Sequence, residues 1–253
     1  MRRAIVYLLA IALAEVVTTV FNPLTGLGLY AALFVVMTLD ATVLNRYVQS
    51  NLVLSLTLVP LIRIVSLSMP LTHIPQIWWY PIIYTPLLIG AIIVAVIDGY
   101  TPGDIGLTLK RWPAQVLMGL SGLVLGYLEY RILLVKPLVS PLTWGMALLP
   151  AALVFVSTGF VEEFIFRGVM QKSATDHFGA WGMLYVAIIF ALLHIGWVTG
   201  PGTSPLARWD IVFVFAVGLF FSWVVRKTGS LAGVFLCHGT INVMLFFVAA
   251  HIL

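Results

Sequence analysis

The stretch Glu162-Glu163-Phe-Ile-Phe-Arg167 places two carboxylates and a guanidinium inside a long apolar segment, residues 144–170, that is typical of a membrane-spanning helix. A charged side chain at the centre of a bilayer costs roughly 2.5–3.5 kcal/mol on insertion scales. Ionisable residues in such a segment therefore indicate a functional site, with partner residues on other helices. The stretch thus predicts a spanning helix that also carries chemistry.

The composition of the whole chain predicts an all-α, polytopic membrane helix bundle. Of the 253 residues, 62% are hydrophobic and 9% are charged, whereas soluble proteins average about 25% charged residues. No stretch is polar enough for a soluble domain, so residues 1–253 are predicted to form a single integral-membrane domain. The net charge of +4 is better explained by loops that face anionic lipid than by nucleic acid. The lipid bilayer is therefore an expected partner, and nucleic acid is not.

Nine apolar segments, separated by Pro, Gly or charged residues, are candidates for spanning helices. A crossing needs roughly 17–25 residues, and most of the segments reach that length. We predict eight or nine transmembrane helices and favour nine, with the second segment the weakest because Asp40 truncates it. Residues 1–112 are expected to hold N-terminal helices of unassigned role, and residues 145–253 the core helices that carry the motifs. The nine segments are 4–21, 28–43, 52–68, 77–96, 114–134, 145–170, 181–198, 211–225 and 231–252.

Basic residues in the loops predict the orientation. If the chain crosses nine times from a cytoplasmic N-terminus, eight basic residues fall on the cytoplasmic side and two on the other side. Membrane proteins usually carry such an excess of Lys and Arg in cytoplasmic loops. We therefore predict a multi-pass protein with a cytoplasmic N-terminus. The larger set is Arg2, Arg3, Arg46, Lys110, Arg111, Lys172, Arg226 and Lys227, and the smaller set is Lys136 and Arg208.

Helix geometry separates the two glutamates. Glu163 and Arg167 are four residues apart, so they share one face and are suited to an internal ion pair. Glu162 is rotated by about 100 degrees from Glu163 and is predicted to face a cavity instead. Glu162 lies about eight residues, or roughly 12 Å, from the expected end of its helix at Met170. This depth predicts a site in the cytoplasmic half of the bilayer that opens toward the cytoplasm.

Two downstream motifs supply partners for Glu162. The segments Phe190-Ala-Leu-Leu-His194 and His238-Gly-Thr-Ile-Asn242 both lie in apolar stretches, and each has its two end residues on one helix face. A buried Glu beside an imidazole can activate water and pass the proton to a leaving amine. A second His and an Asn amide can donate hydrogen bonds to the oxyanion of a tetrahedral intermediate. The set therefore predicts a hydrolytic site within the membrane.

Other unusual residues in apolar segments have simpler interpretations. Glu129 and Arg131 are two residues apart and point in different directions, so each is expected to contact another helix. The single cysteine, Cys237, precedes His238 and invites a thiol-protease interpretation, but a lone Cys in an apolar helix is more typical of a small buried residue. We expect five charged residues in or near the membrane to form ion pairs or to extend to the membrane interface: Glu15, Asp40, Arg63, Glu129 and Arg131.

The ordered set of three motifs resembles that of the CAAX protease and bacteriocin-processing family, also labelled Abi. Its members carry E-E-x-x-x-R, F-x-x-x-H and H-x-x-x-N/D on successive helices, and the resemblance covers residue 148 to the C-terminus. It implies a fold similar to that of type II CAAX prenyl endopeptidases and an intramembrane protease of the glutamate type. The implied substrate is a membrane-associated peptide or protein, prenylated or not. The implied catalytic residues are Glu162 and His194 for water activation and His238 and Asn242 for the oxyanion hole, supported by Glu163, Arg167 and Phe190.

Three alternatives remain open. Some members of that family act as non-catalytic scaffolds, and an immunity protein against bacteriocins belongs to the same class of function. A proton-coupled transporter also uses buried Glu and His, although no related halves are evident in the sequence. No cofactor is predicted, but Glu162, His194 and His238 form a minority alternative as ligands of a catalytic zinc ion.

Overall fold

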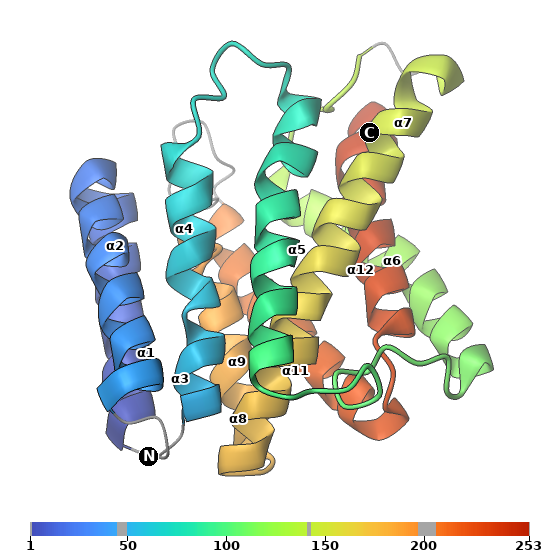
Figure 1. Ribbon diagram of the computed structural model, residues 1–253. Coiled ribbons are helices and arrows are strands. Elements are labelled where there is room, and N and C mark those ends of the chain that lie inside the picture. The colour runs from blue at the N-terminus through green and yellow to red at the C-terminus, as the bar shows by residue number, and fades with distance from the viewer. Residues whose placement is uncertain (1, 45–49, 141–142, 197–205, 253) are drawn as a thin grey trace.

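The computed structural model describes residues 2–44, 50–140, 143–196 and 206–252, and this part of the chain is a bundle of helices without strands (Figure 1). The predicted all-α, polytopic class is confirmed. The N-terminal helices are α1 (Arg2–Val16) with η1 (Val17–Phe21), α2 (Pro23–Leu39) with η2 (Asp40–Leu44), α3 (Ser50–Leu56), α4 (Leu58–Ser68), η3 (Gln76–Trp78) and α5 (Trp79–Ile97). The others are α6 (Trp112–Leu133), α7 (Trp144–Val154), η4 (Phe155–Glu162), η5 (Phe164–Met170), α8 (Gln171–Phe178), α9 (Trp181–Leu192), η6 (Ala207–Trp209), α11 (Asp210–Thr228), α12 (Ala232–Val243), η7 (Met244–Ala249) and α13 (Ala250–Ile252).

Eight helices among the described residues are long and apolar enough to cross a membrane, which makes the chain a multi-pass integral membrane protein. A ninth apolar helix, α9, has 12 residues and corresponds to the predicted segment 181–198. Within that segment α9 ends at Leu192, a turn follows at residues 193–194, and residues 195–196 are helical again. Residues 197 and 198 lie outside the described part of the chain. The predicted range of eight or nine is therefore confirmed, but the described residues give eight such helices and not the favoured nine.

The helix that carries the two glutamates is longer than predicted. It runs without a break from Gly145 to Phe178, whereas the apolar segment ends at Met170. The added turns of α8 are polar and are held by an exposed ion pair, with Lys172 Nζ 2.5 Å from Asp176 Oδ2. An i, i+4 pair of this kind stabilises a helix outside the apolar region. Hydrophobicity therefore located the membrane segment but not the end of the helix.

Charged residues inside the N-terminal helices form buried pairs, as predicted. Arg63 Nε donates to Glu15 Oε2 at 2.8 Å, and Tyr30 Oη donates to the same oxygen at 2.6 Å. Asp40 does not end its helix, because its carboxylate accepts from Arg3 Nη2 at 2.6 Å. A charge within a membrane segment is tolerated when it is paired in this way. These bonds tie α1, α2 and α4 together.

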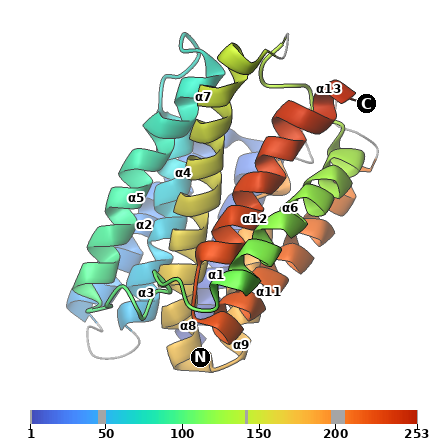
Figure 2. The same ribbon diagram turned by 90° about the vertical axis from the view of Figure 1, so that its right-hand side faces the viewer.

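The C-terminal helices pack closely through small residues. Helices α6 and α12 lie side by side (Figure 2), and a Cβ atom built at Gly122 would be 2.5 Å from the backbone oxygen of Cys237. A Cβ atom at Gly159 of η4 would be 2.8 Å from the backbone nitrogen of Gly239. Small residues permit this close approach of membrane helices. Cys237 itself is fully buried, as predicted.

Candidate active site

The predicted ion pair on the central helix is present. Arg167 Nη1 donates to Glu163 Oε1 at 3.0 Å, and both residues are at most 2% exposed. Glu163 lies at the junction of η4 and η5 and Arg167 lies on η5, so π-helical segments flank the pair. Single-turn π segments occur often at functional sites. The guanidinium also lies over the ring of Phe190, with Cζ 4.1 Å from the ring centroid.

Glu163 has a second partner, which the sequence did not reveal. His238 Nδ1 is 2.8 Å from Glu163 Oε1. An ionised carboxylate only accepts hydrogen bonds, so His238 donates from Nδ1 and keeps Nε2 for other contacts. Glu163 thus connects Arg167 to one of the two imidazoles predicted to be catalytic. The two motifs are 75 residues apart, and spacing within one helix gives no signal for such a contact.

The backbone at the end of α9 holds the imidazole of His194 in place. Its Nδ1 lies 2.7 Å from the backbone oxygen of Phe190, and a carbonyl oxygen only accepts. The proton is therefore on Nδ1, and Nε2 is the basic nitrogen. The rings of Phe190 and His194 have centroids 4.7 Å apart. Phe190 therefore lies beside this imidazole, as the spacing of four residues predicted.

Glu162 points away from the ion pair, as its helical position predicted. Its Oε1 accepts a hydrogen bond from Tyr84 Oη on α5. Tyr80, one turn earlier, stacks on Tyr84 with ring centroids 6.4 Å apart. Neither tyrosine was predicted from the sequence, although their spacing of four residues puts them on one helix face. Residues before 112 therefore contribute directly to the walls around Glu162.

The amide of Asn242 is oriented by a threonine on the central helix. Thr158 Oγ1 donates to the backbone oxygen of Val154 at 2.7 Å, so it can accept from Asn242 Nδ2, which lies 2.9 Å away. Nδ2 carries two hydrogens, and this contact uses one of them. The second hydrogen remains for a ligand.

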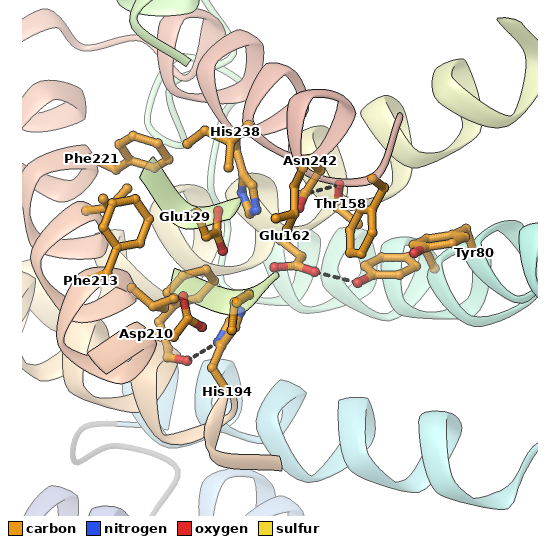
Figure 3. Close-up of a pocket in the computed structure, with 18 residues that line it drawn as sticks. Tyr80, Glu129, Thr158, Glu162, His194, Asp210, Phe213, Phe221, His238 and Asn242 are labelled. Atoms are coloured by element: carbon orange, nitrogen blue, oxygen red, sulfur yellow. Dashed lines mark hydrogen bonds between the residues drawn. The ribbon is translucent and has the colours of Figure 1, made fainter. Parts of the chain in front are cut away.

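Glu162, His194, His238 and Asn242 line one cavity of about 120 Å³ (Figure 3). The three predicted motifs are therefore brought together in space. A second cavity of about 270 Å³ lies beside α4 and α5, and its walls are mainly apolar. Both cavities are lined by Glu162 and His194, so these residues stand where the two spaces meet.

Glu129 and Asp210 also line the first cavity. Glu129 contacts a space between helices, which agrees in part with its predicted orientation toward other helices. Among the described residues, Arg131 bonds within its own helix and not to another helix as predicted, because its Nη1 donates to Tyr127 Oη at 3.0 Å. Asp210 had no signal in the sequence beyond its position at the start of an apolar segment.

Within the described part of the chain, no group of three or more His, Cys, Asp or Glu residues has the arrangement of a metal site.

The cavity and the N-terminus lie toward opposite ends of the bundle. The cavity walls include Tyr80 near the start of α5, Leu133 at the end of α6 and Asp210 at the start of α11. These helix ends lie at the end opposite the N-terminus and the loop of residues 98–111 (Figure 1). The side of the membrane to which the cavity opens stays a prediction. Glu162 lies eight residues before Met170, where the apolar segment ends, and 16 residues before the end of the helix at Phe178.

Comparison with known proteins supports the resemblance seen in the motifs. Residues 143–244 match the family model described as type II CAAX prenyl endopeptidase Rce1-like, and this range contains all three motifs. No match was found among curated proteins or among solved structures. Residues 143–244 are therefore similar to the Rce1-like family of type II CAAX prenyl endopeptidases.

Proposed function

We propose that this protein is an intramembrane endopeptidase of the glutamate type. The observation that carries the proposal is the convergence of Glu162, His194, His238 and Asn242 on one cavity within the helix bundle. Similarity to a family of CAAX proteases supports a hydrolase that acts on peptide bonds. Cleavage of a farnesylated CAAX peptide by the purified protein tests the proposal.

Water activation is assigned to Glu162 and His194. In the proposed reaction, the Glu162 carboxylate accepts a proton from water while the water oxygen attacks the carbonyl carbon of the substrate. Nε2 of His194 is the basic nitrogen of its ring, because Nδ1 donates to Phe190. It holds the attacking water and shares the proton with Glu162. When the carbon–nitrogen bond breaks, this proton moves to the leaving amine.

Stabilisation of the oxyanion is assigned to His238 and Asn242. The protonated imidazole of His238 donates from Nε2, while its Nδ1 stays bonded to Glu163. Asn242 donates the hydrogen of Nδ2 that Thr158 does not use. Two such donors aimed at the position of the developing charge stabilise the tetrahedral intermediate more than the substrate. Glu163, Arg167 and Phe190 act through these residues by holding them in place.

The two cavities suggest how a membrane-associated substrate reaches Glu162. The second cavity has apolar walls that include Ile62, Ile83 and Leu87, and it suits the apolar part of a substrate. The first cavity holds the polar groups that act on the peptide bond. Basic residues near the N-terminus favour a cytoplasmic location for that end. We infer that the first cavity then extends toward the non-cytoplasmic side, from which water enters.

Asn242→Ala is expected to lower turnover by about 100- to 1000-fold, because it removes one oxyanion donor. The thermal midpoint of unfolding should change little, since Asn242 makes one described side-chain bond, to Thr158. Thr158→Val is the matched control. It removes the acceptor that orients the amide but leaves the amide itself, so its loss of turnover should be smaller. A loss of stability in Asn242→Ala as large as that in Glu163→Ala would contradict this role.

A further inference from the structure

Two carboxylates in the first cavity have no part in the proposed hydrolysis. Glu129 lies on α6, and Asp210 is the first residue of α11. Figure 3 shows both turned toward the space that Glu162, His194 and His238 surround. Asp210 is only 1% exposed, and its Oδ1 has no hydrogen-bond partner among the described residues. No described residue makes a hydrogen bond or an ion pair with Glu129 either.

Helix stability does not account for this pair. A carboxylate in the first turn of a helix is favourable, which suits Asp210. Glu129, however, lies one turn from the C-terminal end of α6 at Leu133, where a negative charge is unfavourable. The described walls of the cavity hold no Lys or Arg to offset these two carboxylates, which would repel one another if both were ionised. Buried charges that lack partners are costly, and in membrane helices they mark functional sites.

The rest of the cavity wall is suited to a positive charge. Among the described residues that line it, there is no Lys or Arg, whereas Tyr80, Phe213 and Phe221 contribute aromatic rings. Phe213 lies three residues after Asp210, on the same face of α11. Aromatic faces attract cations, and the attraction is stronger where water is excluded. Carboxylates and aromatic rings around one space form the kind of surface that recognises an ammonium or guanidinium group.

We infer that Glu129 and Asp210 form a subsite for a cationic group of the substrate, such as the side chain of Lys or Arg or a peptide amine. This inference rests on the proposed function, because it places the group beside a bond that Glu162 attacks. The substrate of this protein is therefore a peptide with a basic group near the cleaved bond.

The test uses the full chain in lipid nanodiscs and internally quenched peptides that contain farnesyl-cysteine. Within each set of three peptides, one position carries Lys, norleucine or Glu, and the position is scanned across the three residues on each side of the bond. At one position, kcat/KM for Lys should exceed that for norleucine by about 10-fold or more, as expected for a charge-assisted contact. The Glu peptide should be cleaved more slowly than the norleucine peptide.

Variants then assign the preference to the pair. In the double variant Glu129→Gln and Asp210→Asn, the ratio of Lys to norleucine should fall toward one. Asp176→Asn is the matched control, because this exposed carboxylate of α8 is paired with Lys172 and does not line the cavity. Its ratio should equal that of the wild type. Glu129→Lys should reverse the preference in favour of the Glu peptide.

A binding measurement separates the inference from the proposed function. The Kd values of fluorescent Lys and norleucine peptides are measured with Glu162→Gln, which needs no cleavage. If the wild type cleaves the peptides and no position shows a preference, the cation subsite is wrong and the protease stands. If no peptide is cleaved and the Lys peptide still binds about 10-fold more tightly than the norleucine peptide, the cation subsite is supported and the proposed protease function is wrong. Ratios near one in both measurements overturn the inference.

Discussion

Glu162→Gln is expected to lower the rate of peptide cleavage by about 100- to 10,000-fold, the range that general acid–base catalysis contributes. The substitution keeps the shape of the side chain and an oxygen that can accept from Tyr84 Oη, which bonds Glu162 in the wild type. It removes the carboxylate that takes the proton of water. The thermal midpoint of unfolding should stay close to that of the wild type. The measurement is kcat with a farnesylated CAAX peptide and purified protein.

Tyr84→Phe is the control for the hydrogen bond alone. It keeps the base and removes only its phenol partner, so we expect a loss of about 10-fold or less, in line with the value of one hydrogen bond. Equal cleavage rates for Glu162→Gln and the wild type would make the mechanism wrong. A cellular phenotype fully restored by Glu162→Ala would favour a scaffold or immunity protein. Uptake driven by a pH gradient in vesicles, and lost in Glu162→Gln, would favour a transporter.

Glu163→Ala is expected to lower the free energy of unfolding by about 3–5 kcal/mol, because it leaves the buried guanidinium of Arg167 without its carboxylate. Turnover should also fall, because His238 loses the acceptor that fixes its Nδ1. Glu163→Ala should therefore lose both activity and stability, whereas Asn242→Ala should lose activity and keep its stability. Thermal unfolding and kcat, measured on the same preparations, check both effects.

The double variant Glu163→Leu and Arg167→Met separates the two roles of Glu163. Replacing both members of a buried ion pair by apolar residues is often neutral or stabilising. The double variant should therefore recover most of the stability lost in Glu163→Ala, while turnover stays low because His238 still lacks its partner. Wild-type stability in Glu163→Ala would show that the pair is not needed for the fold. Full turnover in the double variant would show that Glu163 does not position His238.

Contacts within one helix could be predicted from the sequence, and contacts between helices could not. The pairing of Glu163 with Arg167 follows from a spacing of four residues, and the structure has that bond. The same helix geometry predicted that Glu162 faces a cavity, and Glu162 lines the first cavity in the structure. The bonds of Glu163 to His238 and of Glu162 to Tyr84 join helices that are far apart in sequence. Helix periodicity fixes the direction of a side chain but not the neighbour that it meets.

Hydrophobicity located the spanning helices and was less informative about their ends. Asp40 was expected to truncate its helix but lies inside it, because Arg3 neutralises its charge. The central helix continues past Met170 through polar turns, since a helix outside the bilayer needs no apolar residues. Glu129 was expected to have a partner, and its place in the cavity beside Asp210 could be seen only in three dimensions.

The central claim is that Glu162 and His194 activate water directly to hydrolyse a peptide bond. It is tested most directly by the cleavage rate of a farnesylated CAAX peptide with purified protein that has been exhaustively chelated and shown by elemental analysis to hold less than one zinc ion per chain. Our account predicts that this protein releases the C-terminal fragment at the same rate as before chelation. Loss of cleavage on chelation, restored by one equivalent of zinc, would contradict it.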